Sequence, residues 1–298
     1  MIDLKTKKEK FQALLFLTPS LLLYVVCMII PLLGAICFSL SEWKGIAGTP
    51  IQFVGLKNFV SIFGSKQFML ALSNMGKMVF FSVLFHTPIA LLLAVAINAK
   101  YSGHRFFKTV FFLPTVFPLT VTGLLWYFIL MPNGALNTML ELVGLENMVR
   151  YWLVEREIAM YSIIAVNIWA GIGYFMVILI AGLTTIPQEI YEAAAIDGAG
   201  GIQNFFHITI PLLRPVINLC IIMDIIGTIK IFDLVFVMTE GGPNGLTHLP
   251  TTLMYNEAFR YDNYGIGSAI GMVILVTALI LTILGRELLS KKVSLRGL

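Results

Sequence analysis

Six long apolar stretches constrain this chain more than any other feature of its sequence. A helix needs about 20 apolar residues to cross the hydrocarbon core of a bilayer, and each stretch reaches that length. The stretches cover residues 11–40, 78–99, 106–131, 158–183, 216–239 and 263–285. The sequence therefore predicts an all-α membrane protein with six transmembrane helices.

The composition excludes both a water-soluble globular enzyme and a disordered chain. Of the 298 residues, 58% are hydrophobic and only 12% are charged, whereas an ordinary soluble domain has about 25% charged residues. Too few polar side chains remain to cover a soluble body, so lipid must surround much of the surface. No repeat or linker divides the chain, and we expect one transmembrane domain at 11–285 between polar ends at 1–10 and 286–298.

The distribution of basic residues predicts the orientation, because Lys and Arg concentrate in cytoplasmic loops. Of the 20 Lys and Arg residues, 12 lie at the two chain ends or near the loops at 100–105 and 184–215, and 7 lie in the alternate loops. Both ends are therefore expected to face the cytoplasm. On the opposite side, apolar residues among polar ones predict short helices within 53–77 and 132–157.

The cytoplasmic loop at 184–215 is too long for a plain connection, and long loops are commonly functional. Residues 190–196 favour a helix that would end at the glycines after it, and residues 202–210 favour a second short helix that Pro211 would stop. Two short helices joined by a glycine elbow would form a compact projection. The alternative is a loop packed on its own helix bundle.

The same loop carries a specific family resemblance. It runs Glu192-Ala193-Ala194, then Asp197-Gly198-Ala199, Phe205 and Ile208-Thr209-Ile210-Pro211. This run resembles the signature loop of the permease subunits of bacterial ABC importers, in the family of binding-protein-dependent transport inner-membrane components. Residues 53–59 and 239–243 resemble the sugar branch of that family, and the resemblance covers nearly the whole chain. It implies the type I importer permease fold of the maltose, multi-sugar and glycerol-phosphate type.

The resemblance also implies partners and the role of the loop. In that family the loop is the coupling helix, which docks on a separate ATP-hydrolysing subunit. The residues implied for ATPase coupling are Glu192, Ala193, Ala194, Asp197, Gly198, Phe205, Ile208 and Pro211. Asp197 has the alternative role of capping a helix end or turn. A complete importer would combine this chain with a second permease, as a heterodimer, two ATPase subunits and an extracytoplasmic solute-binding protein in a bacterial cell membrane.

Catalytic motifs are absent from the sequence. It holds no G-x-x-x-x-G-K-[ST] phosphate-binding loop, no H-E-x-x-H and no G-x-S-x-G, and its four histidines are scattered. We therefore expect no enzyme activity, no metal site and no cofactor in this chain, with ATP and Mg bound by the partner ATPase subunits. The expected partners include membrane lipid and a sugar substrate but no nucleic acid.

Polar residues inside the apolar stretches mark the expected substrate path, since such groups at membrane depth are commonly functional. They are Asn167, Trp169, Tyr174, Asp224, Thr228, Lys230 and Asp233. Amide, carboxylate and hydroxyl groups beside aromatic rings suit a sugar, although Trp169 and Tyr174 have lipid contact or packing as their alternative. Lys230 and Asp233 are three residues apart, so they would share a helix face and could pair there, for a structural purpose or for substrate contact. Asp224 would need a different partner, and His86 beside Pro88 is expected to be a hydrogen-bonded histidine.

We therefore expect a membrane-spanning subunit of an ATP-driven, binding-protein-dependent importer that forms half of the path for a carbohydrate, such as a di- or oligosaccharide. The alternative is an ion-gradient-driven secondary transporter of a small polar solute, because Asp224 and Asp233 fall at membrane depth. Such a transporter has no evident use for the loop at 184–215. A neutral sugar and a glycerol phosphate are both compatible with the sequence.

Overall fold

The computed structural model describes residues 7–46, 48–99 and 102–290, with side chains from residue 14 to residue 287. Residues 1–6 and 291–298, the greater part of the expected polar ends, lie outside the described residues. Six segments are long and apolar enough to cross a membrane: Leu14–Ser39, Lys66–Asn98, Leu119–Leu142, Ala159–Leu183, Gly201–Ile229 and Tyr264–Glu287. The predicted number of spans is confirmed.

The chain divides into two units, 1–65 with 254–273 and 66–253 with 274–298. The first contains α1 (Lys7–Tyr24), a π turn (Val25–Ile29), α2 (Ile30–Ser39), α3 (Lys57–Gly64), a π turn (Asn256–Arg260) and the beginning of α14 (Tyr264–Ser290). Strands β1 (Ser41–Glu42) and β2 (Gln52–Phe53) form a two-stranded antiparallel ladder in which Ser41 pairs with Phe53. Buried Asn58 donates hydrogen bonds of 2.9 Å to the carbonyls of Ser39 and Ser41, which anchors α3 to this ladder.

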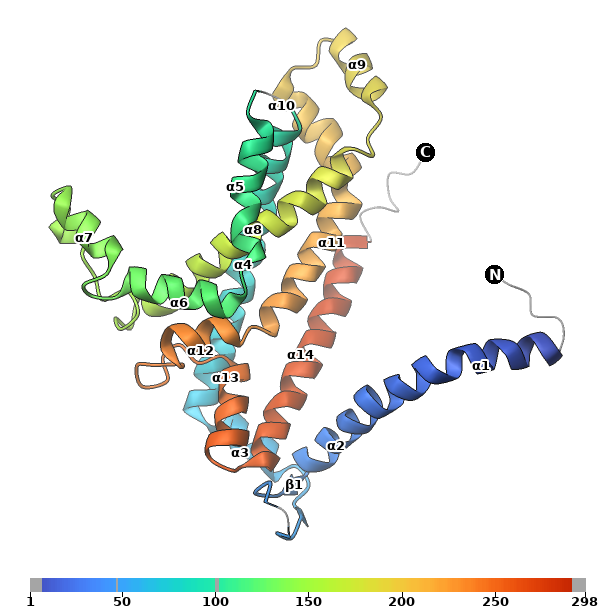
Figure 1. The fold of residues 1–298 in the computed structure, drawn as a ribbon, viewed down its shortest axis with the longest axis vertical. Coiled ribbons are helices and arrows are strands. Elements are labelled where there is room, and N and C mark those ends of the chain that lie inside the picture. The colour runs from blue at the N-terminus through green and yellow to red at the C-terminus, as the bar shows by residue number, and fades with distance from the viewer. Residues whose placement is uncertain (1–6, 47, 100–101, 291–298) are drawn as a thin grey trace. The chain divides into compact units, whose positions relative to one another are not determined.

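The second unit is a helix bundle. It contains α4 (Lys66–Asn98), α5 (His104–Val116), α6 (Leu119–Leu130), α7 (Ala135–Leu142), a 3-10 turn (Glu146–Met148), α8 (Ala159–Leu183), α9 (Gln188–Ile196), α10 (Gly201–Asn204), a π turn (Phe205–Thr209), α11 (Ile210–Ile229), α12 (Asp233–Thr239), most of α13 (Pro250–Tyr255) and the remainder of α14. α8 packs against α4, α5 and α11 (Figure 1). Gly173 permits the contact with α5, because a Cβ there would lie 2.2 Å from the carbonyl oxygen of Phe111.

Two of the predicted spans are interrupted. The expected helix at 106–131 is two helices, because Phe117 and Pro118 are extended between α5 and α6 and a residue before proline is biased away from the helical conformation. The expected helix at 216–239 ends at Ile229 and resumes as α12 at Asp233. Its last turn tightens, since the N–H of Lys230 bonds the carbonyl of Gly227 three residues earlier.

The second interruption makes one prediction wrong. Lys230 caps the end of α11 whereas Asp233 begins α12, so the two residues share no helix face. Both are exposed, and no salt bridge joins them in the described part of the chain. The cause is tertiary packing: α12 packs on α6, where Gly123 lies against Val237. Hydropathy alone does not show that the chain changes direction.

Two further helix boundaries differ from the prediction. α4 begins at Lys66, 12 residues before the expected Met78, because Phe68, Ala71 and Met75 recur at helical spacing and are buried. The second helix of the 184–215 loop does not stop at Pro211 but continues through the π turn into α11. Pro211 lies directly after the π turn, where the regular α-helical hydrogen-bond pattern is already interrupted. The short helices expected within 53–77 and 132–157 are present as α3 and α7.

Candidate functional site

A cavity of about 400 Å³ lies between α4, α5, α8 and α11. Four residues of the expected substrate path line it: Asn167 and Tyr174 from α8, and Asp224 and Thr228 from α11. They meet because α8 and α11 pack against each other and against α4. The structure therefore brings together polar residues from two stretches that are separate in the sequence.

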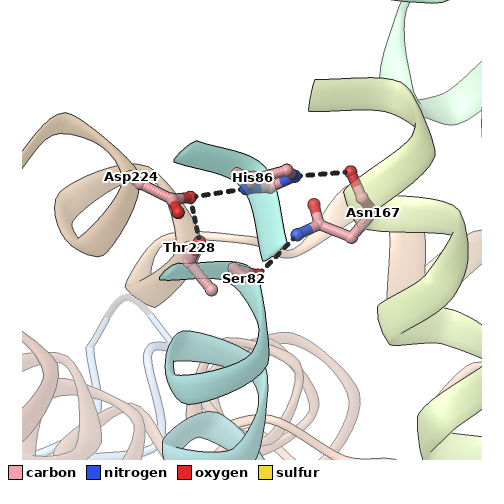
Figure 2. A network of polar contacts seen from close by, with 5 residues as sticks. All are labelled: Ser82, His86, Asn167, Asp224 and Thr228. Carbon is pink, nitrogen blue, oxygen red and sulfur yellow. Dashed lines mark hydrogen bonds and ion pairs between the residues drawn. The ribbon is translucent and has the colours of Figure 1, made fainter. Parts of the chain in front are cut away.

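Figure 2 shows five buried side chains that connect beside this cavity. His86 Nδ1 lies 2.9 Å from Asp224 Oδ1, and His86 Nε2 lies 3.1 Å from the backbone oxygen of Asn167. Thr228 Oγ1 donates to the same Asp224 oxygen over 3.2 Å, and the Asn167 amide donates to Ser82 Oγ over 2.9 Å. The network joins α4, α8 and α11 through side chains.

The partners of the His86 ring fix the positions of its protons. A backbone carbonyl oxygen only accepts hydrogen bonds, so Nε2 carries a proton. Nδ1 faces a carboxylate oxygen, and a single proton between these two atoms satisfies both, whether it rests on the imidazole or on Asp224. The pair has no net charge in either arrangement, which lowers the cost of placing it at membrane depth.

Gly171 makes room for the imidazole. A Cβ at this position would lie 2.6 Å from His86 Nε2, well inside van der Waals contact, so glycine lets the ring reach the carbonyl of Asn167. The predicted hydrogen bonding of His86 is confirmed. The sequence does not predict that His86 lies in the cavity wall. The signal that could have indicated it is the presence of a carboxylate that needs a partner, Asp224, in one expected span and a histidine in another.

The other three residues of the expected path lie outside this cavity. Trp169 lines a separate apolar hollow of about 460 Å³ between α4, α5 and α8. Its ring also packs edge-on against the Trp126 ring, with 5.3 Å between the ring centroids. Lys230 and Asp233 are exposed beyond the end of α11. The part of these three residues in substrate transport stays a prediction.

The segment at 184–215 contains α9, which lies at one end of the bundle (Figure 1). α9 is followed by Gly198, whose φ of +81° lies in the left-handed region that suits glycine. The Tyr191 hydroxyl lies 3.1 Å from Thr209 Oγ1, which joins α9 to the π turn before α11. A side-chain contact therefore connects α9 to the helix that continues into α11.

The expected coupling residues divide between the outer and inner sides of this segment. Exposed are Glu192, Ala193, Asp197, Gly198 and Pro211, and half-buried are Ala194, Phe205 and Ile208. Two further apolar residues, Ile196 and Ile202, are 87% and 78% exposed. Within the described residues, the chain's own bundle does not cover them, and exposed apolar clusters commonly mark interaction sites. The loop is thus packed on the bundle only in part.

Residues 86–294 match the model of a family described as the binding-protein-dependent transport system inner membrane component. The chain belongs to this family. The permease is 36% identical over 280 residues to the probable ABC transporter permease protein YurN of Bacillus subtilis, covering 93% of this chain and 95% of that protein. It is 32% identical over 284 residues to the trehalose/maltose transport system permease protein MalF of Thermococcus litoralis, covering 94% of each.

The solved structures bear out the fold. A chain in the crystal structure of a bacterial ABC transporter that imports the acidic polysaccharide alginate superposes on this permease with a TM-score of 0.84 at 24% identity, covering 95% of this chain and 96% of that one. The expected type of permease fold is therefore confirmed.

Family membership also decides what kind of molecule this permease is. It is a multi-pass component of the inner membrane and a transport subunit without catalytic activity. The permease has no cofactor of its own, and ATP is held by separate ATPase subunits. Within residues 7–46, 48–99 and 102–290, no group of three or more His, Cys, Asp or Glu is placed to hold a metal ion.

Proposed function

We propose that this permease forms half of the translocation path for a carbohydrate, a di- or oligosaccharide, in an ATP-driven importer. The observation that carries the proposal is the cavity between α4, α5, α8 and α11, which combines buried hydrogen-bonding groups with the half-exposed ring of Tyr174. Sugar sites need this combination of directed polar groups and an aromatic surface. The names of relatives such as the trehalose/maltose permease support a sugar substrate.

The partners in this proposal are a second permease, with which the chain forms a heterodimer, two ATPase subunits and an extracytoplasmic solute-binding protein. Both ends of the chain face the cytoplasm, together with the segment at 184–215. The exposed apolar residues of that segment support its docking on an ATPase. An ion-gradient-driven transporter would have no partner for this surface.

The mechanism follows from the continuity of one helix. Residues Gly201–Ile229 form one continuous helix of 29 residues that includes the π turn at Phe205–Thr209, and it is roughly 43 Å long at about 1.5 Å per residue. One end adjoins α9, and the other carries Asp224 and Thr228 into the cavity wall. A displacement of α9 by the closing ATPase pair would therefore move the cavity wall directly. Alternating access then requires only that the ATP-bound complex favours one of two arrangements of the bundle.

Copurification from native membranes tests this function. Wild-type permease is expected to retain an ATPase and a second permease in mild detergent. Gly198→Val should lose the ATPase, because a β-branched residue is strongly disfavoured at a φ of +81°. Gly200→Val is the matched control, since its φ is −74° and neither glycine has an atom within 4 Å of an added Cβ.

The proposal fails if the wild-type chain purifies alone or only with itself. It also fails if both valine variants retain the ATPase equally, because the left-handed turn would then be irrelevant to docking. Uptake of a labelled di- or trisaccharide by cells that express the complete importer tests the substrate class.

A further inference from the structure

We propose that Asp224 restricts the transported solute to neutral, hydroxyl-rich sugars and excludes anionic ones, with His86 as the residue that positions its carboxylate. This inference rests on the proposed function, because it takes the cavity to be part of the substrate path. It decides between the neutral sugar and the glycerol phosphate that the sequence leaves open.

The two oxygens of Asp224 have different surroundings. Oδ1 makes both of the hydrogen bonds of this carboxylate, one with the Thr228 hydroxyl and one with the His86 ring. Oδ2 is buried and has no hydrogen-bond partner within the described residues, although Asp224 lines the cavity. The side chain is only 2% exposed, and a buried polar atom without a partner is rare in a folded protein. A solute in the cavity is the natural source of the missing donor.

Oδ2 is an acceptor whatever the protonation of the pair. The proton shared with His86 lies at Oδ1, where the imidazole is 2.9 Å away. When that proton rests on the imidazole, Oδ2 belongs to a carboxylate, and when it rests on Asp224, Oδ2 is a carbonyl oxygen. Either form accepts a hydrogen bond from a sugar hydroxyl. Neither form offers a proton to a phosphate or carboxylate oxygen.

The rest of the cavity wall gives an anion no compensation. Among the residues that the structure describes, no Lys or Arg lines the cavity, and both ring nitrogens of its histidine already have hydrogen-bond partners. Lys230 is exposed and does not line the cavity. An anionic group beside Asp224 would lose its hydration without gaining a cation, which is an effective way to reject the wrong solute.

Uptake by the complete importer tests this inference. Cells that express it are offered labelled neutral trisaccharides (maltotriose and cellotriose among a panel), trigalacturonate and glycerol 3-phosphate. We expect uptake of at least one neutral sugar and of neither anion. Uptake of an anion at a rate comparable to the best neutral sugar would overturn the inference. If the wild type takes up no sugar at all, the proposed function fails and this inference fails with it.

Variants assign the effect to the two residues. Asp224→Leu removes the acceptor and should lower the sugar transported per ATP hydrolysed about tenfold. Asp224→Asn keeps an oxygen at the position of Oδ2 and should stay within about threefold of wild type. The matched control is Glu141→Leu, which changes an exposed carboxylate of α7 outside the cavity and should have no effect.

The amount of sugar transported per ATP hydrolysed also distinguishes a positioning role of His86 from a purely structural one. His86→Gln should lower sugar transported per ATP while leaving ATP hydrolysis itself near the wild-type rate, whereas a merely structural role would lower both together. Where Asp224→Leu fails to reach the membrane, the double variant with His86→Leu removes the buried carboxylate and its imidazole partner together and serves for the measurement. Full transport per ATP in a folded variant without the Asp224 acceptor would overturn the role of Asp224.

Discussion

Replacing Gly171 by alanine tests whether the polar network depends on contact between α4 and α8. The added Cβ would lie 2.6 Å from His86 Nε2 and 3.0 and 3.3 Å from two ring carbons. The imidazole must therefore move, and it would lose the carbonyl of Asn167, now 3.1 Å away, and the alignment with Asp224. Overpacking typically costs about 1–3 kcal/mol, and leaving a buried polar group without its partner costs about 1–3 kcal/mol more.

The expected destabilisation is therefore about 4 kcal/mol, the middle of the summed range. At about 2–4 °C per kcal/mol for a chain of this size class, the Tm should fall by roughly 8–16 °C. This shift is measured by heating the protein in detergent and then quantifying the folded fraction by size-exclusion chromatography with fluorescence detection. Gly76→Ala is the control, because Gly76 also lies within a helix but has no atom within 4 Å of an added Cβ. That variant should melt at or slightly above the wild-type temperature.

A double variant sharpens the result. Adding His86→Ala to Gly171→Ala removes the ring that the methyl group strikes, so the two effects should be non-additive by about 1–2 kcal/mol. The reasoning is refuted if Gly171→Ala melts within 1 °C or so of wild type, or if the double variant shows simple additivity.

Three further predictions concern other parts of the chain. Asn74→Ala removes hydrogen bonds of 2.7 and 3.1 Å to two carbonyls of the 241–248 loop, so hydrogen exchange in that loop should rise by an order of magnitude or more; unchanged exchange would contradict this anchoring role. Asn137→Ala removes a buried amide that donates hydrogen bonds to two carbonyls and accepts one from an indole N–H. Proteolytic cleavage between residues 142 and 158 should therefore accelerate, and an unaltered cleavage pattern would contradict this role of Asn137. Lys57→Ala breaks an exposed ion pair of 3.1 Å with Glu42 and should change stability by less than about 0.5 kcal/mol; a Tm drop of several degrees would show that the pair matters more than its exposure suggests.

The six spans are predictable from the sequence because lipid offers no hydrogen bonds to the backbone. A chain in that solvent must close its hydrogen bonds within helices, and the length and hydropathy of each stretch are then enough to find it. The exact ends are less predictable. The break at Phe117 comes directly before Pro118, which disfavours a helical conformation at the residue before it. After Ile229 the chain turns where α12 packs against α6, and the hydropathy of the stretch does not show this packing.

The candidate site is predictable by residue type but not by pairing. Asn167, Tyr174, Asp224 and Thr228 stand out as polar residues in apolar stretches, and all four line one cavity. The expected pairing of Lys230 with Asp233 is wrong, since it assumed one continuous helix. The partner that Asp224 requires is His86, which is 138 positions away in the sequence.

The sequence by itself determined the solvent, the number of spans, the family and the polar residues that a transport path needs. Each of these follows from local composition, spacing or a contiguous motif. Only the tertiary structure decided that His86 and Asp224 lie within hydrogen-bonding distance of each other, that Gly171 makes room for the imidazole, and that a single helix joins the segment at 184–215 to the cavity wall. These features depend on distances between helices, and helix packing sets those distances through small residues and backbone breaks that hydropathy does not register.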